Sequence, residues 1–176
     1  MIVGVQRYTL IYMDEKYNLA YIDGANLHKG IQNLGWNLDY EKFYRWLKAK
    51  YKMERAYIFL GHIPKHQPLY NNLTAIGYDL IFKEVTTHLG KPKGNCDAEM
   101  VLQVVSDYYE QKLNKAILVT GDGDFACLID FLCERNAFHR LIAPNIAYTS
   151  YLLRKRNLST VYLEATRLVP HIRKDP

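Results

Sequence analysis

Short apolar runs alternate with amphipathic stretches along most of this 176-residue chain. An apolar run that ends in turn residues, such as "YNLAYID" followed by "GAN", predicts a buried strand. Apolar residues that recur every three or four positions predict a helix with one buried face. Strands are expected at 17–23, 55–63, 78–85, 115–120, 140–145 and 159–164. Helices are expected at 38–51, 66–76, 96–112, 124–135 and 149–156.

This alternation predicts an α/β fold, with a mostly parallel central sheet covered by helices on both faces. No linker or repeat interrupts the pattern, so residues 1–176 are expected to form one domain. The weakly alternating "RYTLIYM" within 1–16 is a candidate for an extra edge strand or extension, at which two copies of the chain would pair as a homodimer. In such sheets, binding sites lie outside the carboxyl ends of the strands, where strand order reverses.

Aspartates stand at the ends of two predicted strands and at the start of one predicted helix. Asp23 ends the first strand, and Asp122 and Asp124 stand in "TGDGDF" after a later strand. Asp97 lies in the first turn of the helix that follows a basic loop. Carboxylates gathered at one sheet edge disfavour one another's ionisation unless a divalent cation holds them, and Mg²⁺ and Mn²⁺ take oxygen ligands. The sequence therefore predicts an Mg²⁺ or Mn²⁺ site formed by Asp23, Asp97, Asp122 and Asp124.

The same residues also fit other roles. Asp122 or Asp124 can cap the helix that follows, with the flanking glycines serving only the turn. Asn26 can orient a metal-bound water or contact phosphate, or it can cap a short helix at 27–34. Thr120 can contact a site carboxylate or a phosphate, or it can be an ordinary buried threonine of the strand.

Two further acidic residues lie on the helix predicted at 96–112. Asp107 is ten residues beyond Asp97, which rotates it by about 80° from the Asp97 face, and Glu99 also points elsewhere. Both are expected to face solvent. The apolar face of this helix is predicted to consist of Met100, Val101, Val104, Val105 and Tyr108.

An excess of basic residues favours an anionic partner. The chain has 23 Lys and Arg against 18 Asp and Glu, for a net charge of +5, which indicates nucleic acid. Fifteen tyrosines offer rings that can stack on unpaired bases, although most are expected to serve packing. Basic clusters are expected to contact phosphate in "GKPKGN" and near the end of the chain. Their members are Lys91, Lys93, Arg154, Lys155 and Arg156.

Several classes of protein are disfavoured by what the sequence lacks. Three cysteines without a C-x-x-C pair indicate reduced thiols, a cytoplasmic protein and no zinc site. No apolar stretch approaches the roughly 20 residues of a membrane span, and the first residues do not resemble a signal peptide. The six histidines are scattered, and no nucleophile elbow or phosphate-binding loop is present.

The segments "YIDGANL", "KGNCDAEMVL" and "ILVTGDGDFACLI" together resemble the NYN domain family, the LabA-like proteins of the PIN-like nuclease superfamily. The resemblance runs from about residue 17 to about residue 164. It implies a three-layer α/β/α PIN-like domain whose acidic residues match Asp23, Asp97, Asp122 and Asp124, with Asn26 and Thr120 in support. Many family members carry another acidic residue on the helix, where this chain has Gln103 and Val104.

These observations together predict a metal-dependent ribonuclease that hydrolyses phosphodiester bonds in single-stranded RNA. The alternative is a catalytically weak or inactive domain that serves as an RNA-binding or regulatory interaction module. A phosphatase of small phosphate esters ranks last, because the sequence lacks a motif for a covalent phospho-enzyme.

Overall fold

A parallel sheet of six strands forms the centre of the part of the chain that the computed structural model describes, which is residues 16–83, 86–88, 91–93, 96–165 and 168–174. The strand order is β3-β2-β1-β6-β7-β8, and each neighbouring pair is parallel. The strands are β1 (Tyr17–Asp23), β2 (Met53–Gly61), β3 (Tyr78–Lys83), β6 (Leu113–Val119), β7 (Phe138–Ala143) and β8 (Thr160–Tyr162).

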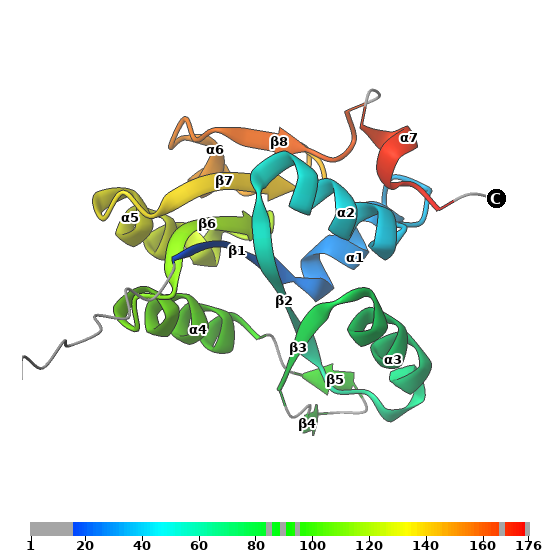
Figure 1. Ribbon diagram of the computed structural model, residues 1–176. Helices are drawn as coiled ribbons and strands as arrows, with labels where there is room; N and C mark the ends of the chain where they lie inside the picture. Colours follow the sequence, from blue (N-terminus) through cyan, green and yellow to red (C-terminus); the bar gives the residue numbers. More distant parts are fainter. Residues whose placement is uncertain (1–15, 84–85, 89–90, 94–95, 166–167, 175–176) are drawn as a thin grey trace, which may run out of the picture.

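Helices cover both faces of the sheet (Figure 1). One face packs against α1 (Gly24–Gln32), α2 (Tyr40–Tyr51), α3 (Gln67–Ile76) and α7 (Val169–Ile172). The other packs against α4 (Asp97–Tyr109), α5 (Ala126–Glu134) and α6 (Tyr151–Arg154). Two short 3₁₀ turns, η1 (Pro64–His66) and η2 (Gly123–Phe125), lead into α3 and α5. The predicted three-layer α/β/α fold is confirmed.

Both faces of the central strands are buried, which explains why they read as continuous apolar runs. In β1, Leu19 and Tyr21 pack against the α4 and α5 layer, whereas Ala20 and Ile22 pack against the α1 and α2 layer. A charged residue has no place inside such a strand, so the aspartates stand where the strands end.

The strand order reverses between β1 and β6. From β1 the chain builds outward to β2 and β3, and it then returns to add β6, β7 and β8 on the other side of β1. Ile22 pairs with Val119 at the carboxyl ends of β1 and β6. The next residues, Asp23 and Thr120, therefore lie side by side at the switch point, where α/β sheets place their ligands.

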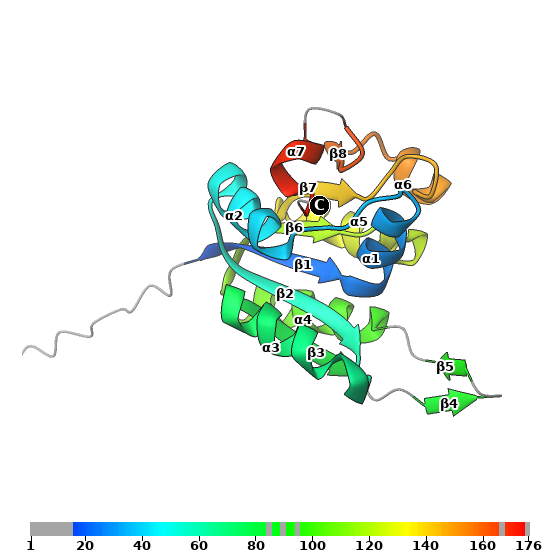
Figure 2. The ribbon, with the colours of Figure 1, turned by 90° about the vertical axis from the view of Figure 1, so that its right-hand side faces the viewer.

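The basic segment 90–95 was expected to be a loop, and this prediction was partly wrong. Within it, β5 (Lys91–Lys93) is a short strand that pairs antiparallel with β4 (Thr86–His88), and the two form a hairpin between β3 and α4. Figure 2 shows this hairpin extending from the body of the molecule beside the start of α4. Residues 1–15 lie outside the described residues, so the proposed edge strand and homodimer surface stay predictions. In the described part of the chain, no helix is long and apolar enough to cross a membrane.

Asp107 was expected to face solvent, and the structure shows that this was wrong. The buried side of α4 is formed by Met100, Val104 and Asp107, a spacing of four and then three residues that makes one helical stripe. Asp107 is 1% exposed, and its carboxylate accepts hydrogen bonds from the Tyr21 hydroxyl at 2.9 Å and from Gln103 at 3.1 Å. Measuring the rotation from Asp97 misled the prediction, because Asp97 lies at the sheet edge and not at the centre of the buried stripe.

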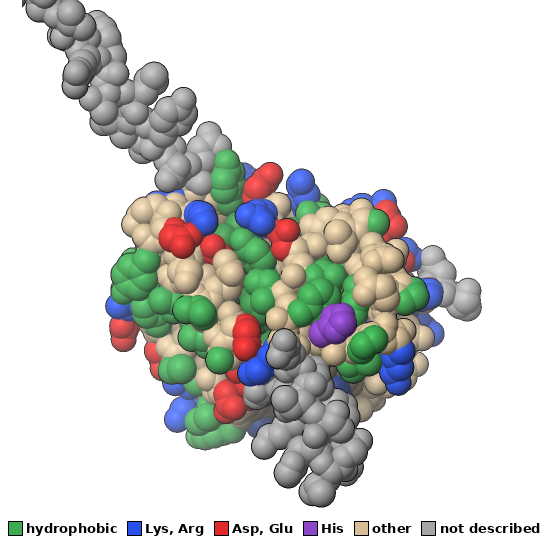
Figure 3. Space-filling model, turned by 90° about the horizontal axis from the view of Figure 1, so that it is seen from below, with side chains coloured by type: hydrophobic (Ala, Val, Ile, Leu, Met, Phe, Trp, Pro, Cys, Tyr) green, Lys and Arg blue, Asp and Glu red, His purple; other side chains and the backbone are tan. Residues whose placement is uncertain are grey.

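Glu99 is also less exposed than expected. Its side chain is 31% exposed and pairs with Lys83 of β3, with 3.3 Å between Nζ and Oε1. Figure 3 looks onto the molecule from the α3 and α4 side. Apolar side chains lie there among charges of both signs. The described residues of this face do not form a continuous basic surface.

Candidate metal and active site

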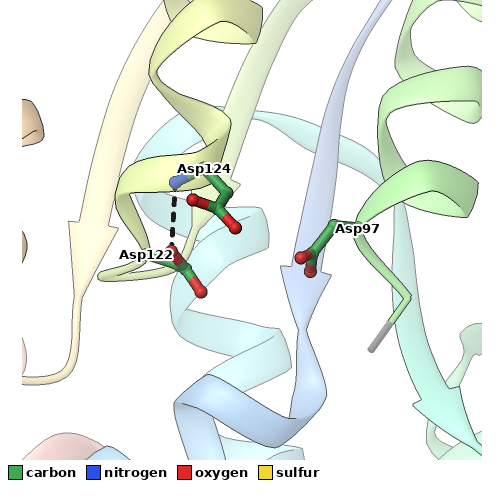
Figure 4. A group of neighbouring side chains, drawn as sticks. All are labelled: Asp97, Asp122 and Asp124. Atoms are coloured by element: carbon green, nitrogen blue, oxygen red, sulfur yellow. Dashed lines mark hydrogen bonds between the residues drawn. The ribbon is translucent and has the colours of Figure 1, made fainter. Parts of the chain in front are cut away.

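Three carboxylates meet at the carboxyl edge of the sheet. Asp97, Asp122 and Asp124 each place one carboxylate oxygen so that the three atoms lie within 4.8 Å of one another. Asp97 opens α4, whereas Asp122 and Asp124 belong to the turn after β6, and Figure 4 shows them pointing into the same space. Two segments that are distant in the sequence therefore supply one acidic group, as the parallel topology requires.

The turn "TGDGDF" folds so that both of its aspartates reach this space. Asp122 caps η2, and its side chain accepts a hydrogen bond from the backbone N–H of Asp124 at 3.0 Å. Gly123 lies against Ser150, so close that a Cβ at this position would overlap the serine hydroxyl. Asp122 therefore caps the 3₁₀ turn that leads into α5, and its carboxylate also belongs to the acidic group.

Asp23 adjoins the three-carboxylate group without being one of its members. Its side chain caps α1 by accepting from the backbone N–H of Asn26 at 3.0 Å, and it accepts from the Thr120 hydroxyl at 3.2 Å. Burial raises the pKa of Asp23 to about 6, against the lowering effect of these two hydrogen bonds. The charges of Asp97 and Asp122 raise this pKa further, so Asp23 is coupled electrostatically to two members of the acidic group.

Asn26 and Thr120 hold the two strand ends together. The Asn26 side-chain oxygen accepts from the backbone N–H of Gly121 at 2.8 Å, and the cap of α1 is Asp23, not Asn26. Thr120 is 0% exposed, and its hydroxyl also accepts from the N–H of Asp122 at 3.1 Å. Of the roles considered for Thr120, the structure shows the contact with a site carboxylate, and its burial leaves no surface for a phosphate.

The donor set fits a hard divalent cation. The described group contains carboxylate oxygens and no thiol or imidazole, which is the chemistry that Mg²⁺ and Mn²⁺ prefer. Cys96 stands directly before Asp97, but burial foremost, with the nearby charge of Glu99, raises the pKa of its thiol to about 11. The thiol therefore stays neutral near neutral pH and is a poor ligand and nucleophile.

The predicted phosphate-binding cations lie in two different settings. Lys91 and Lys93 belong to β5 of the hairpin. Arg154 and Lys155 are exposed near α6. Arg156 is held by Asp130 through two hydrogen bonds of 2.7 Å, which lowers the pKa of that carboxyl. Arg156 is therefore already paired with an anion of the chain.

Sequence reasoning missed the residues that close the site opposite α4. A cavity of about 300 Å³ holds Asp122 and Asp124 and is also lined by Tyr148, Ser150 and Leu152, which follow β7. A second hollow of about 150 Å³ adjoins it and is lined by Lys29, Asn33 and Tyr148 among others. The segment "PNIAYTS" carried only a turn signal, and nothing in it announced proximity to the aspartates.

A larger cavity lies elsewhere, between α2 and β8. It measures about 580 Å³ and is lined by Trp46, Tyr51 and Tyr162 together with Lys50 and His171. Its lining contains no carboxylate. Of these two cavities, only the smaller one is lined by Asp122 and Asp124 of the acidic group.

Comparison with known proteins agrees with this architecture. A crystal structure of a protein of unknown function from Vibrio parahaemolyticus is similar in fold, with a TM-score of 0.71 and 22% sequence identity over 93% of this chain and 100% of that one. No curated protein matches the chain. The family model of the NYN domain matches residues 19–162, a range that begins in β1 and ends with β8. The chain therefore belongs to the NYN domain family.

Proposed function

We propose that this NYN domain is a metal-dependent nuclease of the LabA-like branch of the PIN-like superfamily, and that it hydrolyses phosphodiester bonds in single-stranded RNA. One observation carries the proposal: Asp97, Asp122 and Asp124 bring three carboxylate oxygens within 4.8 Å of one another at the topological switch point. Structural carboxylates are normally dispersed or paired with cations, because crowding them costs free energy. The gathering of three carboxylates, two of which line an open cavity, favours a cation-binding role.

Each acidic residue has a distinct part in this proposal. Mg²⁺ or Mn²⁺ would be held by Asp97, Asp122 and Asp124. Asp23, which adjoins this group, would add negative charge to the site. A bound ion would supply an activated water and would stabilise negative charge on the phosphate and on the leaving oxygen. Asn26 keeps the turn after β6 in place through Gly121, and its side chain lines the cavity in which the scissile phosphate would lie.

RNA is the proposed substrate because the acidic site belongs to a chain with an excess of positive charge. The net charge of +5 includes Lys91, Lys93, Arg154 and Lys155, which would contact phosphates of the substrate. Phosphate contacts set affinity and register without reading sequence, so we expect little base preference from them. Reduced thiols and an RNA substrate both fit action in the cytoplasm.

A second candidate is a binding module without catalysis. The observation that favours it is Gln103, which stands where many family members carry another acidic residue. Here Gln103 donates to the buried Asp107, and neighbouring Val104 is fully buried, so neither adds a ligand to the group. Fewer carboxylates would weaken metal binding and leave the basic residues as the functional part of the surface.

Cleavage of a labelled single-stranded RNA separates these candidates. The wild type is incubated with Mn²⁺, with Mg²⁺ or with EDTA, beside Asp122→Asn and beside Asp79→Asn, which removes an exposed carboxylate on β3. The asparagine at 122 can still cap η2, so the fold is retained. Cleavage that needs metal, is lost in Asp122→Asn and persists in Asp79→Asn supports the nuclease. RNA binding without cleavage under every condition supports the binding module.

A further inference from the structure

One exposed aromatic ring lies at the junction of the two hollows beside the acidic group. Tyr148 lines the cavity that contains Asp122 and Asp124, and it also lines the adjoining hollow that contains Lys29 and Asn33. Tyr148 is 65% exposed. Because both hollows are lined by Tyr148, this residue lies between the carboxylates and Lys29.

Hydrogen bonds hold the backbone at Tyr148 in place. The N–H of Tyr148 donates to the side-chain oxygen of Asn145 at 2.8 Å, and Asn145 is 1% exposed. The Asn145 amide in turn donates to the carbonyl of Gly30 in α1 at 3.2 Å. Beyond Tyr148, the N–H of Ser150 donates to the carbonyl of Gly121 in the turn after β6 at 2.9 Å. The ring is thus mounted on a braced turn between α1 and the acidic turn.

The side chain of Tyr148 does not serve aromatic packing. Within the described residues, the ring contacts between aromatic side chains do not include it, whereas Tyr21, Tyr57 and Tyr78 each pack against another ring. An aromatic side chain has few rotamers to lose, so a ring on a fixed backbone binds a flat partner at low entropic cost. A nucleic-acid base is such a partner, and Lys29 lies where the neighbouring phosphate would follow.

We infer that Tyr148 is a stacking platform that holds one unpaired base of the substrate beside the acidic group. The inference rests on the proposed function for its substrate. A ring reaches the face of a base only when that base is free of its neighbour, so a platform here selects single-stranded nucleic acid next to the cleaved bond. Double-stranded substrate would meet the ring with its backbone and gain no stacking.

The first test is binding of a labelled single-stranded RNA, and of a hairpin stem of the same composition, with Ca²⁺ as an oxygen-seeking ion. The variants are Tyr148→Ala, Tyr148→Phe and Tyr151→Ala, a matched control that is 68% exposed and lines neither hollow. Tyr148→Ala is expected to weaken single-strand binding about 5- to 100-fold, the usual loss for one stacked base. The single-strand affinities of Tyr148→Phe and Tyr151→Ala should stay within about 2-fold of the wild type, because neither variant removes the stacking ring at position 148. The affinity for the hairpin stem should not change in any variant, because paired bases do not stack on this ring.

A second test removes single bases from the RNA instead of changing the protein. A set of oligonucleotides, each with one abasic position, should show one position that weakens binding to the wild type and no such position for Tyr148→Ala. Equal affinities of Tyr148→Ala and Tyr151→Ala overturn the platform, even where Asp122→Asn proves the nuclease. Selective loss of single-strand binding in Tyr148→Ala keeps the platform, even where the wild type cleaves nothing and the nuclease proposal fails.

Discussion

The hydroxyl of Thr120 donates to a carboxylate oxygen of Asp23 across 3.2 Å, and this contact joins the ends of the two central strands. Asp23 is thereby held as an anion in a place where burial favours its neutral form. Two hydrogen bonds do not outweigh that burial, since the pKa of Asp23 stays raised at about 6. Without a bound cation, the ionised Asp23 therefore lowers the stability of the folded chain.

Asp23→Asn is expected to stabilise the metal-free protein at neutral pH. Below pH about 3.8 the carboxyl is neutral in both the folded and the unfolded chain. As the pH rises from there to about 6, the unfolded chain ionises first, so the wild type loses stability. Above that range the deficit is about 3 kcal/mol at most for a shift of this size. Asparagine removes the ionisation and can still cap α1.

Urea unfolding of Asp23→Asn and of the wild type, with EDTA present, measures this difference in stability. A range from about pH 3.5 to about pH 8 covers the ionisation of Asp23 in both the unfolded and the folded chain. The two should agree at the acid end and diverge with rising pH. Asp39→Asn is the control, because Asp39 caps α2 by accepting from the N–H of Lys42 at 2.9 Å outside the acidic group. A variant at position 23 that is less stable than the wild type at pH 8 would contradict the raised pKa.

Divalent cations are expected to stabilise the wild type. A ligand that binds only the folded state adds about 2.7 kcal/mol at a hundred times its Kd, which for a domain of this size raises the Tm by about 5–10 °C. Asp97→Asn and Asp122→Asn should lose most of the shift that Mn²⁺ causes, whereas Asp79→Asn should keep it. Differential scanning fluorimetry measures all four proteins. An undiminished shift in Asp97→Asn would show that the ion binds elsewhere.

Gly123→Ala is expected to distort the acidic turn. The new methyl group would overlap the Ser150 hydroxyl and approach the Ser150 Cβ to 3.0 Å, so Ser150 or η2 has to move. Overpacking of this kind typically costs about 1–3 kcal/mol. Thermal unfolding should show the loss, and Mn²⁺ titration should show weaker binding. Adding Ser150→Gly should recover part of both, and failure to recover either would mean that the clash is not the cause.

Tyr21→Phe is expected to destabilise the fold without affecting the acidic group. Removal of the hydroxyl leaves the buried carboxylate of Asp107 with one of its two side-chain donors, and such a loss costs about 1–3 kcal/mol. Chemical unfolding measures the cost, and the Mn²⁺-induced stabilisation should stay unchanged. The double variant Tyr21→Phe with Asp107→Leu should be more stable than Tyr21→Phe alone, because it removes both polar partners. A further loss in the double variant would assign Asp107 another role.

The order of strands and helices and the gathering of Asp97, Asp122 and Asp124 could be predicted from the sequence. Parallel strands bring their carboxyl ends to one edge, and aspartates that follow apolar runs must stand at that edge. Tyr148 could not be predicted in the same way, because its position depends on where the turn after β7 folds over α1. Pro144 and Gly30 decide this by their close packing, and neither pattern nor spacing encodes such a contact.

Asp107 shows a different limit of sequence reasoning. The helical spacing of Met100, Val104 and Asp107 was visible in the chain, but the prediction measured the position of Asp107 only by its rotation from Asp97. The sequence also did not show that a hydrogen-bond donor on another element, Tyr21 of β1, faces this carboxylate. A buried polar pair between two elements therefore becomes visible only once the helix and the sheet are packed together.

The hydrogen bond between Asp23 and Thr120 spans 97 positions of the chain. A ribosome adds about 5–20 residues per second, so several seconds separate the synthesis of the first strand end from that of its partner. Until β6 and its turn have emerged, the growing chain lacks Thr120, Asp122 and Asp124 and cannot assemble the acidic edge. If the domain cleaves RNA, the nascent chain therefore gains its acidic edge only in the last third of its synthesis.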